Sequence, residues 1–123
     1  MQDDKTKRKK EFKRRIYDFT LKLINFIDKL PHDNISKRLG DQLLRSGTSV
    51  IANYIEGQAA SSRKDFTNFL NISLKSCNES KLWLSLLKDS GKASEKDTKF
   101  LLDELIEFSN IFASSILTLR NRK

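Results

Sequence analysis

Four polar residues could together form a site: Arg45, Asn53 and Glu56 lie in one predicted helix, and Glu79 lies in the next. Asn53 and Glu56 are three residues apart, so they share one face of a helix. A guanidinium, an amide and two carboxylates could hold a ligand or a partner. They could also form a hydrogen-bonded network that sets the register of the two helices. We favour the structural network, in which loss of Arg45 would strand its partners and lower stability.

The sequence contains few groups suited to catalysis. His32 is the only histidine and Cys77 the only cysteine. A di-iron bundle needs Glu-x-x-His pairs on facing helices, and no glutamate stands three residues before His32. The chain also has no nucleophile turn around a serine and no phosphate-loop or dinucleotide fingerprint. We therefore expect no enzymatic activity, no cofactor and no metal site.

Apolar residues recur three or four positions apart in four segments, which is the spacing of one face of an α-helix. The first segment covers about residues 8–30, and Pro31 ends it because proline cannot continue a helix. Asn34 or Ser36 can cap the second segment, and Gly57 is its expected stop. These signals predict two helices of about 20 to 30 residues.

The third and fourth segments have similar boundaries. Ser62 and Ser94 each begin a pattern typical of a helix N-cap, and Gly91 closes the third segment. Short connections favour antiparallel neighbours, so the predicted fold is all-α, an antiparallel up-down-up-down four-helix bundle. Residues 1–123 are expected to form one domain with a basic N-terminal extension over about residues 1–10.

The second and third segments carry more apolar residues than one bundle core can use. The surplus edge contains Ile51, Ile55, Phe69, Ile72 and Trp83. A large exposed apolar patch is unusual on a monomer. The chain is therefore expected to form a homo-oligomer.

Positive charge is concentrated at the start of the chain. The net charge is +8, and residues 1–15 hold eight Lys or Arg against Asp3, Asp4 and Glu11. Such an excess predicts an anionic partner, RNA or DNA above all. In an up-down-up-down bundle, both termini and the connection between helices two and three lie at one end. The expected binding cluster contains Lys5, Lys7, Arg8, Lys9, Lys10, Lys13, Arg14, Arg15, Arg63, Lys64, Arg120, Arg122 and Lys123.

A longer pattern occupies about the middle half of the chain. It consists of Gln42-Leu-Leu-Arg-Ser-Gly-Thr-Ser-Val, Ala52-Asn-Tyr, Glu56, Ser62-Arg-Lys-Asp-Phe, Leu74-Lys, Glu79-Ser, Trp83-Leu and Leu86-Leu. In order and spacing it resembles the bacterial four-helix-bundle proteins also called the 23S ribosomal RNA intervening-sequence protein family. One departure is Ile51, where members of that family usually carry Gly or Pro.

The resemblance implies a ring-like homopentamer. It also implies a distant similarity to the accessory protein of diversity-generating retroelements, which binds a reverse transcriptase and nucleic acid. Many family members are encoded within an insertion in a ribosomal RNA gene, a location that does not demonstrate action on the RNA. The resemblance therefore adds a reverse transcriptase to the expected partners.

Two kinds of function remain open at this point. The protein could bind nucleic acid or a nucleic-acid enzyme, or it could be a structural or protein-interaction scaffold whose basic tail only aids solubility. The start of the chain lacks the apolar segment of a signal peptide, and no run reaches the roughly 18 to 20 apolar residues of a membrane span. We expect a cytoplasmic protein with no membrane partner.

Overall fold

Each of the four helices begins after a side chain that accepts a hydrogen bond from the first helical turn, in a computed structural model that describes residues 3–121. The four capping side chains belong to Asp3, Asp33, Ser62 and Ser94. The helices are α1 (Asp4–Asp28), α2 (Asn34–Gln58), α3 (Arg63–Asp89) and α4 (Glu95–Arg120).

Two of the predicted starts are confirmed and two are corrected. Ser62 and Ser94 are the caps of α3 and α4. The cap of α2 is Asp33, not Asn34 or Ser36, because Asp33 has the extended backbone and accepts from the Ser36 amide at 2.9 Å. α1 begins at Asp4, so residues 4–10 of the basic extension are part of the helix.

The two glycines predicted to end helices behave differently. Gly91 has a φ of +79°, and the amides of the two residues after it donate to the Leu87 carbonyl, so it closes α3 as expected. Gly57 does not end α2, which continues to Gln58. Its role is close packing, since a Cβ there would lie 3.1 Å from the Cβ of Phe69.

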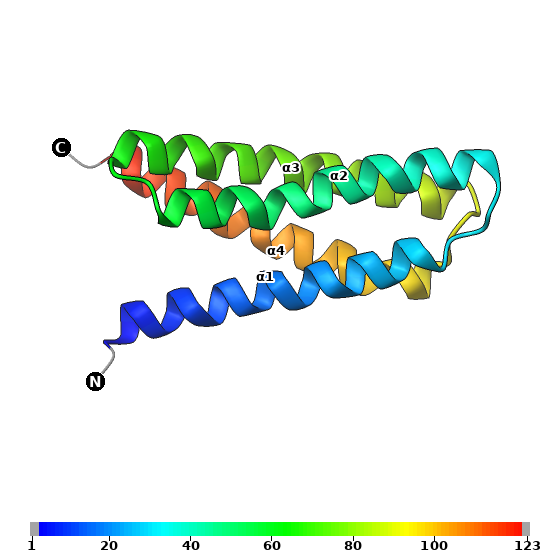
Figure 1. Ribbon diagram of the computed structural model, residues 1–123, viewed down its shortest axis with the longest axis horizontal. Coiled ribbons are helices and arrows are strands. Elements are labelled where there is room, and N and C mark those ends of the chain that lie inside the picture. The colour runs from blue at the N-terminus through cyan, green and yellow to red at the C-terminus, as the bar shows by residue number, and fades with distance from the viewer. Residues whose placement is uncertain (1–2, 122–123) are drawn as a thin grey trace.

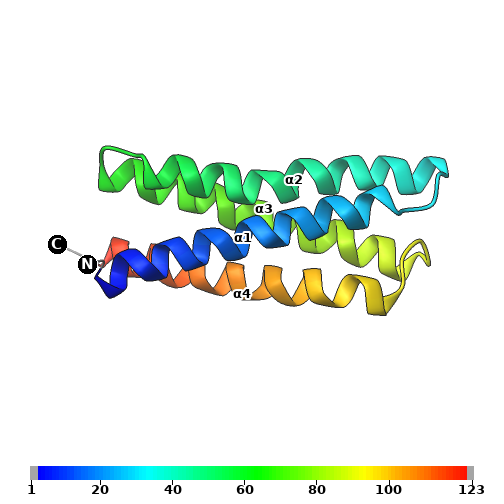
Figure 2. The same ribbon diagram turned by 60° about the horizontal axis from the view of Figure 1, so that its bottom comes forward.

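The four helices run alternately in opposite directions, as the colour sequence in Figure 1 shows. Both termini and the α2–α3 connection lie at one end, and the α1–α2 and α3–α4 connections lie at the other (Figures 1 and 2). The predicted all-α up-down-up-down bundle is thus the observed fold. No strand is present between residues 3 and 121.

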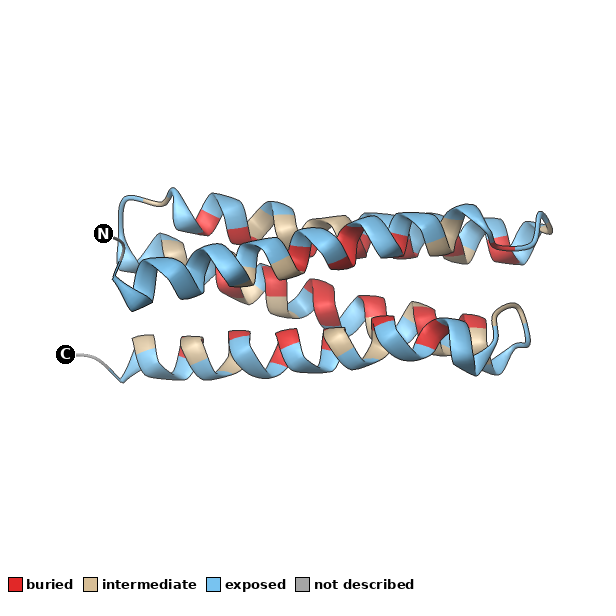
Figure 3. Ribbon diagram, turned by 90° about the horizontal axis from the view of Figure 1, so that it is seen from below, coloured by how far each residue is buried: buried red, intermediate tan, exposed pale blue. Residues whose placement is uncertain are grey.

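The core lies along the bundle axis, where the buried residues of each helix face inward (Figure 3). The predicted apolar seams supply most of it, including Phe19, Leu43, Leu84 and Phe108. At the end with the termini, the half-buried Phe12 lies at the centre of a cluster of aromatic rings. Its ring lies edge-on to Tyr54, Phe108 and Phe112, with centroids 5.2, 5.8 and 5.7 Å away.

Packing is uneven around the bundle: α2 and α3 contact each other most extensively, and α1 and α4 least. Small residues allow the close approach of the α2–α3 pair. On the side of α2 that meets α1, a Cβ at Gly47 would lie 2.0 Å from Leu23 Cδ2, so only glycine fits there without displacement of a fully buried leucine. The loose α1–α4 seam leaves parts of both helices accessible from outside.

Candidate nucleic-acid interface

Three separate basic segments lie at the end of the bundle that carries the termini (Figures 1 and 2). They are the start of α1, the start of α3 and the end of α4. A hollow of about 360 Å³ joins them, with Lys9 from α1, Arg63 from α3 and Leu119 from α4 in its lining. The fold therefore brings Lys9 and Leu119, 110 residues apart in the sequence, into the lining of one hollow.

Most of the predicted cationic side chains at this end point to solvent. The exposed members of the cluster are Lys5, Lys7, Arg8, Lys9, Lys10, Lys13, Arg14, Arg63, Lys64 and Arg120. Within residues 3–121, only Arg14 among them forms an ion pair, with Asp18 at 3.2 Å on the surface. Arg122 and Lys123 lie outside the described residues. The exposed set is sterically available to phosphate groups.

Arg15 is a correction to the predicted cluster. Its Nε donates to Glu104 Oε2 at 2.9 Å, and a terminal nitrogen donates to Glu104 Oε1 at 2.6 Å and also to Glu107. Its Cζ lies 5.4 Å from the centroid of the Phe108 ring. The hydrogen bonds that Arg15 donates to Glu104 and Glu107 hold the pKa of Arg15 above its ordinary value. These interactions of Arg15 with Glu104 and Glu107, called the Arg15 clasp below, join α1 to α4. They occupy the guanidinium group within the chain.

The two carboxylates of this clasp were missed in the sequence. Glu104 lies 89 residues from Arg15, and no local pattern links them. The sequence signal for this pair is the position of each residue on its helix. Arg15 is next to the buried seam residue Ile16, and Glu104 is next to the buried seam residue Leu105. Charged residues that flank two facing seams are candidates for such pairs.

The network expected of Arg45, Asn53, Glu56 and Glu79 does not form within the chain. Arg45, Glu56 and Glu79 are exposed, and none makes a hydrogen bond or ion pair through its side chain to another residue in the range 3–121. Asn53 is half-buried, and its amide donates to the carbonyl and hydroxyl of Ser49, both at 2.9 Å. Arg45 and Glu56 of α2 and Glu79 of α3 all lie on solvent-exposed parts of their helices.

Serine side chains link α2 to α3 in place of that network. Ser46 and Ser80 share a hydrogen bond of 2.7 Å, and Ser76 donates to Ser49 at 2.8 Å. Ser73 donates to the Val50 carbonyl at 3.1 Å. Buried hydroxyls are thereby satisfied between the two closest helices, as burial of polar groups requires.

The single histidine and the single cysteine of the sequence have different surroundings in the structure. His32 is exposed in the α1–α2 connection. Cys77 is fully buried in the core, and burial raises the pKa of its thiol to about 12, against a smaller lowering by a hydrogen bond from Ser109. Within the part of the chain that the structure describes, no three His, Cys, Asp or Glu side chains gather closely enough to hold a metal ion.

The family follows from a comparison with known proteins. The family model described as "23S rRNA-intervening sequence protein" matches residues 8–114, which include nearly all of the four helices. The chain belongs to the 23S rRNA-intervening sequence protein family. The resemblance of the central pattern to this family is therefore confirmed.

A solved structure of a similar protein has the same fold. It is a protein of unknown function from the S23 ribosomal protein family of Bacteroides thetaiotaomicron, 33% identical, with a TM-score of 0.79. The match covers 85% of this chain and 96% of the other. No curated protein matches the sequence. Among residues 3–121, no helix combines the length and apolarity that crossing a membrane requires.

Replacing Arg15 with glutamine should destabilise this member of the 23S rRNA-intervening sequence protein family by about 1–2 kcal/mol, because Glu104 would lose a two-point charged partner. The value is discounted for the 38% exposure of the arginine side chain. The measurement is urea unfolding at equilibrium. Arg14→Gln is the matched control, and its loss should stay below about 0.5 kcal/mol since its partner is an exposed Asp18. Equal losses would contradict a structural role specific to Arg15.

The buried thiol predicts a pH dependence of stability. In the unfolded chain Cys77 ionises near a pKa of about 8.5, whereas in the folded chain it stays protonated to higher pH. Alkaline pH thus favours the unfolded state, in which the thiol can ionise. The stability that the buried, neutral thiol retains at lower pH is therefore lost as the pH rises. Between about pH 8 and about pH 10, the wild type should lose about 1–2 kcal/mol more than Cys77→Ala. Parallel pH profiles of the two proteins would contradict burial of the thiol.

Proposed function

We propose that the protein is a non-enzymatic, self-associating helical-bundle protein that binds nucleic acid, RNA or DNA, through its basic end in the cytoplasm. The observation that carries this proposal is the convergence of three basic segments around one hollow, lined by Lys9 and Arg63 among others. Exposed lysine and arginine side chains supply the sequence-independent part of nucleic-acid affinity by neutralising phosphates.

The helical start of α1 supports this proposal. Residues 4–10 continue the helix, so Lys5, Lys9 and nearby cations have set spacings along a rigid rod. Rigid presentation lowers the entropy lost when the charges are ordered on a phosphate backbone. A basic helix start would normally be weakened by the positive end of its dipole, and Asp3 and Asp4 offset that effect.

Contacts at this end are expected to read the nucleic-acid backbone and not the bases. The aromatic residues near the termini, Phe12, Tyr54 and Phe112, pack on one another inside the bundle. They are therefore not available as stacking platforms. Recognition by charge alone predicts weak sequence preference and strong dependence on salt.

Outward-facing apolar residues support self-association. Tyr17, Leu21 and Ile24 form a stripe on α1, and their exposures are 52, 51 and 44%. The neighbouring α2 has a stripe of its own, in which Leu44 and Ile55 are 39 and 42% exposed. Ile72, Leu82 and Leu86 add exposed apolar surface on α3. Burial between copies would remove these side chains from water.

The number of copies in the assembly is proposed as five. This number comes from the resemblance to the family and not from the exposed surface of one chain. A closed ring would repeat the basic end on each copy, so that weak contacts to one nucleic-acid chain would add through avidity.

A nucleic-acid-processing enzyme such as a reverse transcriptase is the protein partner of this proposal. Its support is the resemblance of the central sequence pattern, not a contact in the structure. A reverse transcriptase gene beside this reading frame would favour it. The alternative function, a scaffold without a nucleic-acid role, is supported by the same exposed apolar stripes and predicts assembly without RNA or DNA binding.

Neutralising three cations at the basic end should weaken nucleic-acid binding. The triple variant Lys7→Gln, Lys9→Gln and Lys10→Gln removes three phosphate contacts, so the slope of log K against log salt should fall by about 2.7 on duplex DNA. The measurement is fluorescence anisotropy with labelled RNA and DNA at several salt concentrations.

The matched control removes the same charge elsewhere. Lys37, Lys75 and Lys96 are exposed on α2, α3 and α4, away from the end with the termini. Changing these three to glutamine leaves the net charge equal to that of the first variant, and binding should stay near wild type. Equal loss in both variants, or no binding by the wild type, would reject the basic end as the interface.

Self-association should be visible by light scattering at micromolar concentration, with a mass near five chains. Ile55→Glu places a charge in the apolar stripe of α2 and should shift the mass toward the monomer, because a buried unpaired charge opposes association. Thr118→Glu, at an exposed position of α4, is the control and should retain the assembly. A folded wild-type monomer would contradict the proposal.

A further inference from the structure

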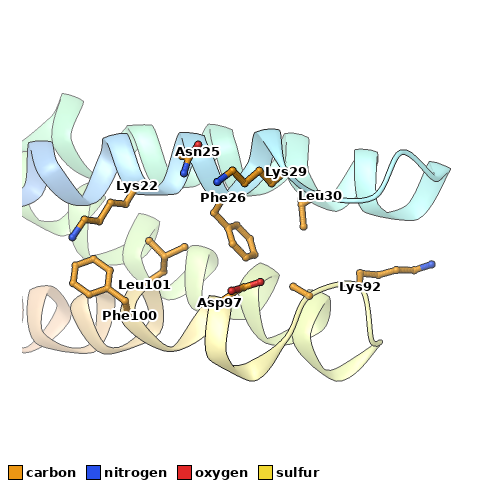
Figure 4. A pocket seen from close by; sticks show the side chains of 10 residues that line it. Lys22, Asn25, Phe26, Lys29, Leu30, Lys92, Asp97, Phe100 and Leu101 are labelled. Carbon is orange, nitrogen blue, oxygen red and sulfur yellow. The ribbon is translucent and has the colours of Figure 1, made fainter.

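A second cavity lies between α1 and α4, toward the end of the bundle opposite the termini (Figure 4). Its volume is about 410 Å³, within the range of cavities that hold small ligands. The buried side chains of Leu30 and Leu101 form its apolar floor. The cavity exists because α1 and α4 pack loosely beyond the Arg15 clasp.

Two phenylalanines form the walls of this cavity, one from each helix. Phe26 of α1 is half-buried and points into the space between the helices, and Phe100 of α4 borders it (Figure 4). Phe100 is 44% exposed, a high value for so apolar a ring. The Nζ of Lys22 covers it, 4.1 Å from the ring centroid. The exposed face of such a ring can hold either a cation or, once the cation moves aside, a flat aromatic group.

The charges around the cavity favour an anion. Lys22 and Lys29 of α1 both reach its rim, and neither forms an ion pair within residues 3–121. Lys92 also lines the cavity, but its ammonium points away toward Asp33, 3.4 Å distant (Figure 4). Asp97 points inward and opposes an anion. Two ammonium groups without an ion-pair partner among residues 3–121, against one carboxylate, leave a net positive site.

We propose that this cavity binds a nucleotide: a flat heteroaromatic base against Phe100 and Phe26, with its phosphate held by Lys22 and Lys29. Each half of the ligand matches one half of the site, because the rings accept a planar apolar group and the ammonium groups accept an anion. Lys22 leaves the ring face and pairs with the phosphate, which frees the face for stacking. The inference does not depend on the basic end, since the two sites lie at opposite ends of the bundle.

The same chemistry is presented by a free mononucleotide and by the phosphorylated end of a nucleic-acid strand. The probe is 2-aminopurine riboside 5′-monophosphate, whose fluorescence is quenched on stacking. Wild-type protein is expected to quench it saturably, and the unphosphorylated riboside and inorganic phosphate should each bind more weakly. No saturable quenching, or equal binding of riboside and nucleotide, would overturn the proposal.

Three variants test the named contacts. Phe100→Leu keeps an apolar side chain and removes the ring, so affinity should fall by about 5- to 150-fold. Lys22→Gln should weaken binding by about 2- to 5-fold, while Asp97→Asn should strengthen it by a similar factor. Lys75→Gln, exposed on α3 and outside the lining of the cavity, is the control and should bind as wild type. Unchanged affinity in Phe100→Leu and Lys22→Gln, with the fold intact by circular dichroism, would overturn the site.

A second arm identifies the source of the nucleotide. A tetranucleotide with a 5′-phosphorylated 2-aminopurine is compared with the mononucleotide, both against wild type and Phe100→Leu. Equal or tighter binding of the tetranucleotide, lost in Phe100→Leu, supports the site and assigns it to strand ends. Weaker binding of the tetranucleotide supports the site and assigns it to free nucleotides.

Discussion

The hydrogen bond between Ser46 and Ser80, together with the pair formed by Ser49 and Ser76, lies inside the interface on which the rest of the bundle depends. Two helices can approach this closely only where their facing side chains are small, and small apolar residues alone would leave little to set their register. Hydroxyl pairs supply direction, because each needs its partner at one height along the helices. Loss of one partner would leave a buried polar group without a hydrogen bond.

The close α2–α3 pair determines how the other two helices can pack. α1 meets α2 at Gly47, where Leu23 takes the space of a side chain. α4 packs on α3, and α1 and α4 then meet at a greater separation than the other neighbours. The aromatic contacts of Phe12 and the clasp between Arg15 and Glu104 hold this fourth seam together. The cavity with Phe100 lies beyond them, lined by side chains of α1 and α4.

The distribution of charge follows from the same packing. Arg15 stands next to a core residue of α1 and reaches a carboxylate of α4, so part of the basic run serves the fold. Lys7, Lys9 and Lys10 lie on the first turns of α1. Their side chains are exposed and form no ion pair with an acidic residue among residues 3–121. The basic residues at the start of the chain therefore fall into two groups: Arg15, which stabilises the fold, and the exposed lysines, which are accessible to a partner.

The sequence by itself determined the helices, the residues that face inward and several of the residues at which helices begin and end. Phe12, Ile16 and the later seam residues were predictable because helical periodicity is a local property, and so were the caps at Ser62 and Ser94 and the stop at Gly91. The gathering of three basic segments was also predictable, since short connections force alternating directions. The resemblance of the chain to its family was carried by residues in the middle of the sequence.

Only the tertiary structure decided which polar groups pair. Arg45, Glu56 and Glu79 have the composition of a network, but their side chains are exposed and form no hydrogen bond or ion pair with one another. The serines between α2 and α3 form that network instead, and Arg15 finds its carboxylate 89 residues away. The cavity between α1 and α4 has no signal in the sequence, because Lys22 and Phe100 come together only through the separation of two helices. The physical reason is the same in each case: helix formation depends on neighbours in sequence, whereas polar pairing depends on helix rotation and spacing that the whole core sets.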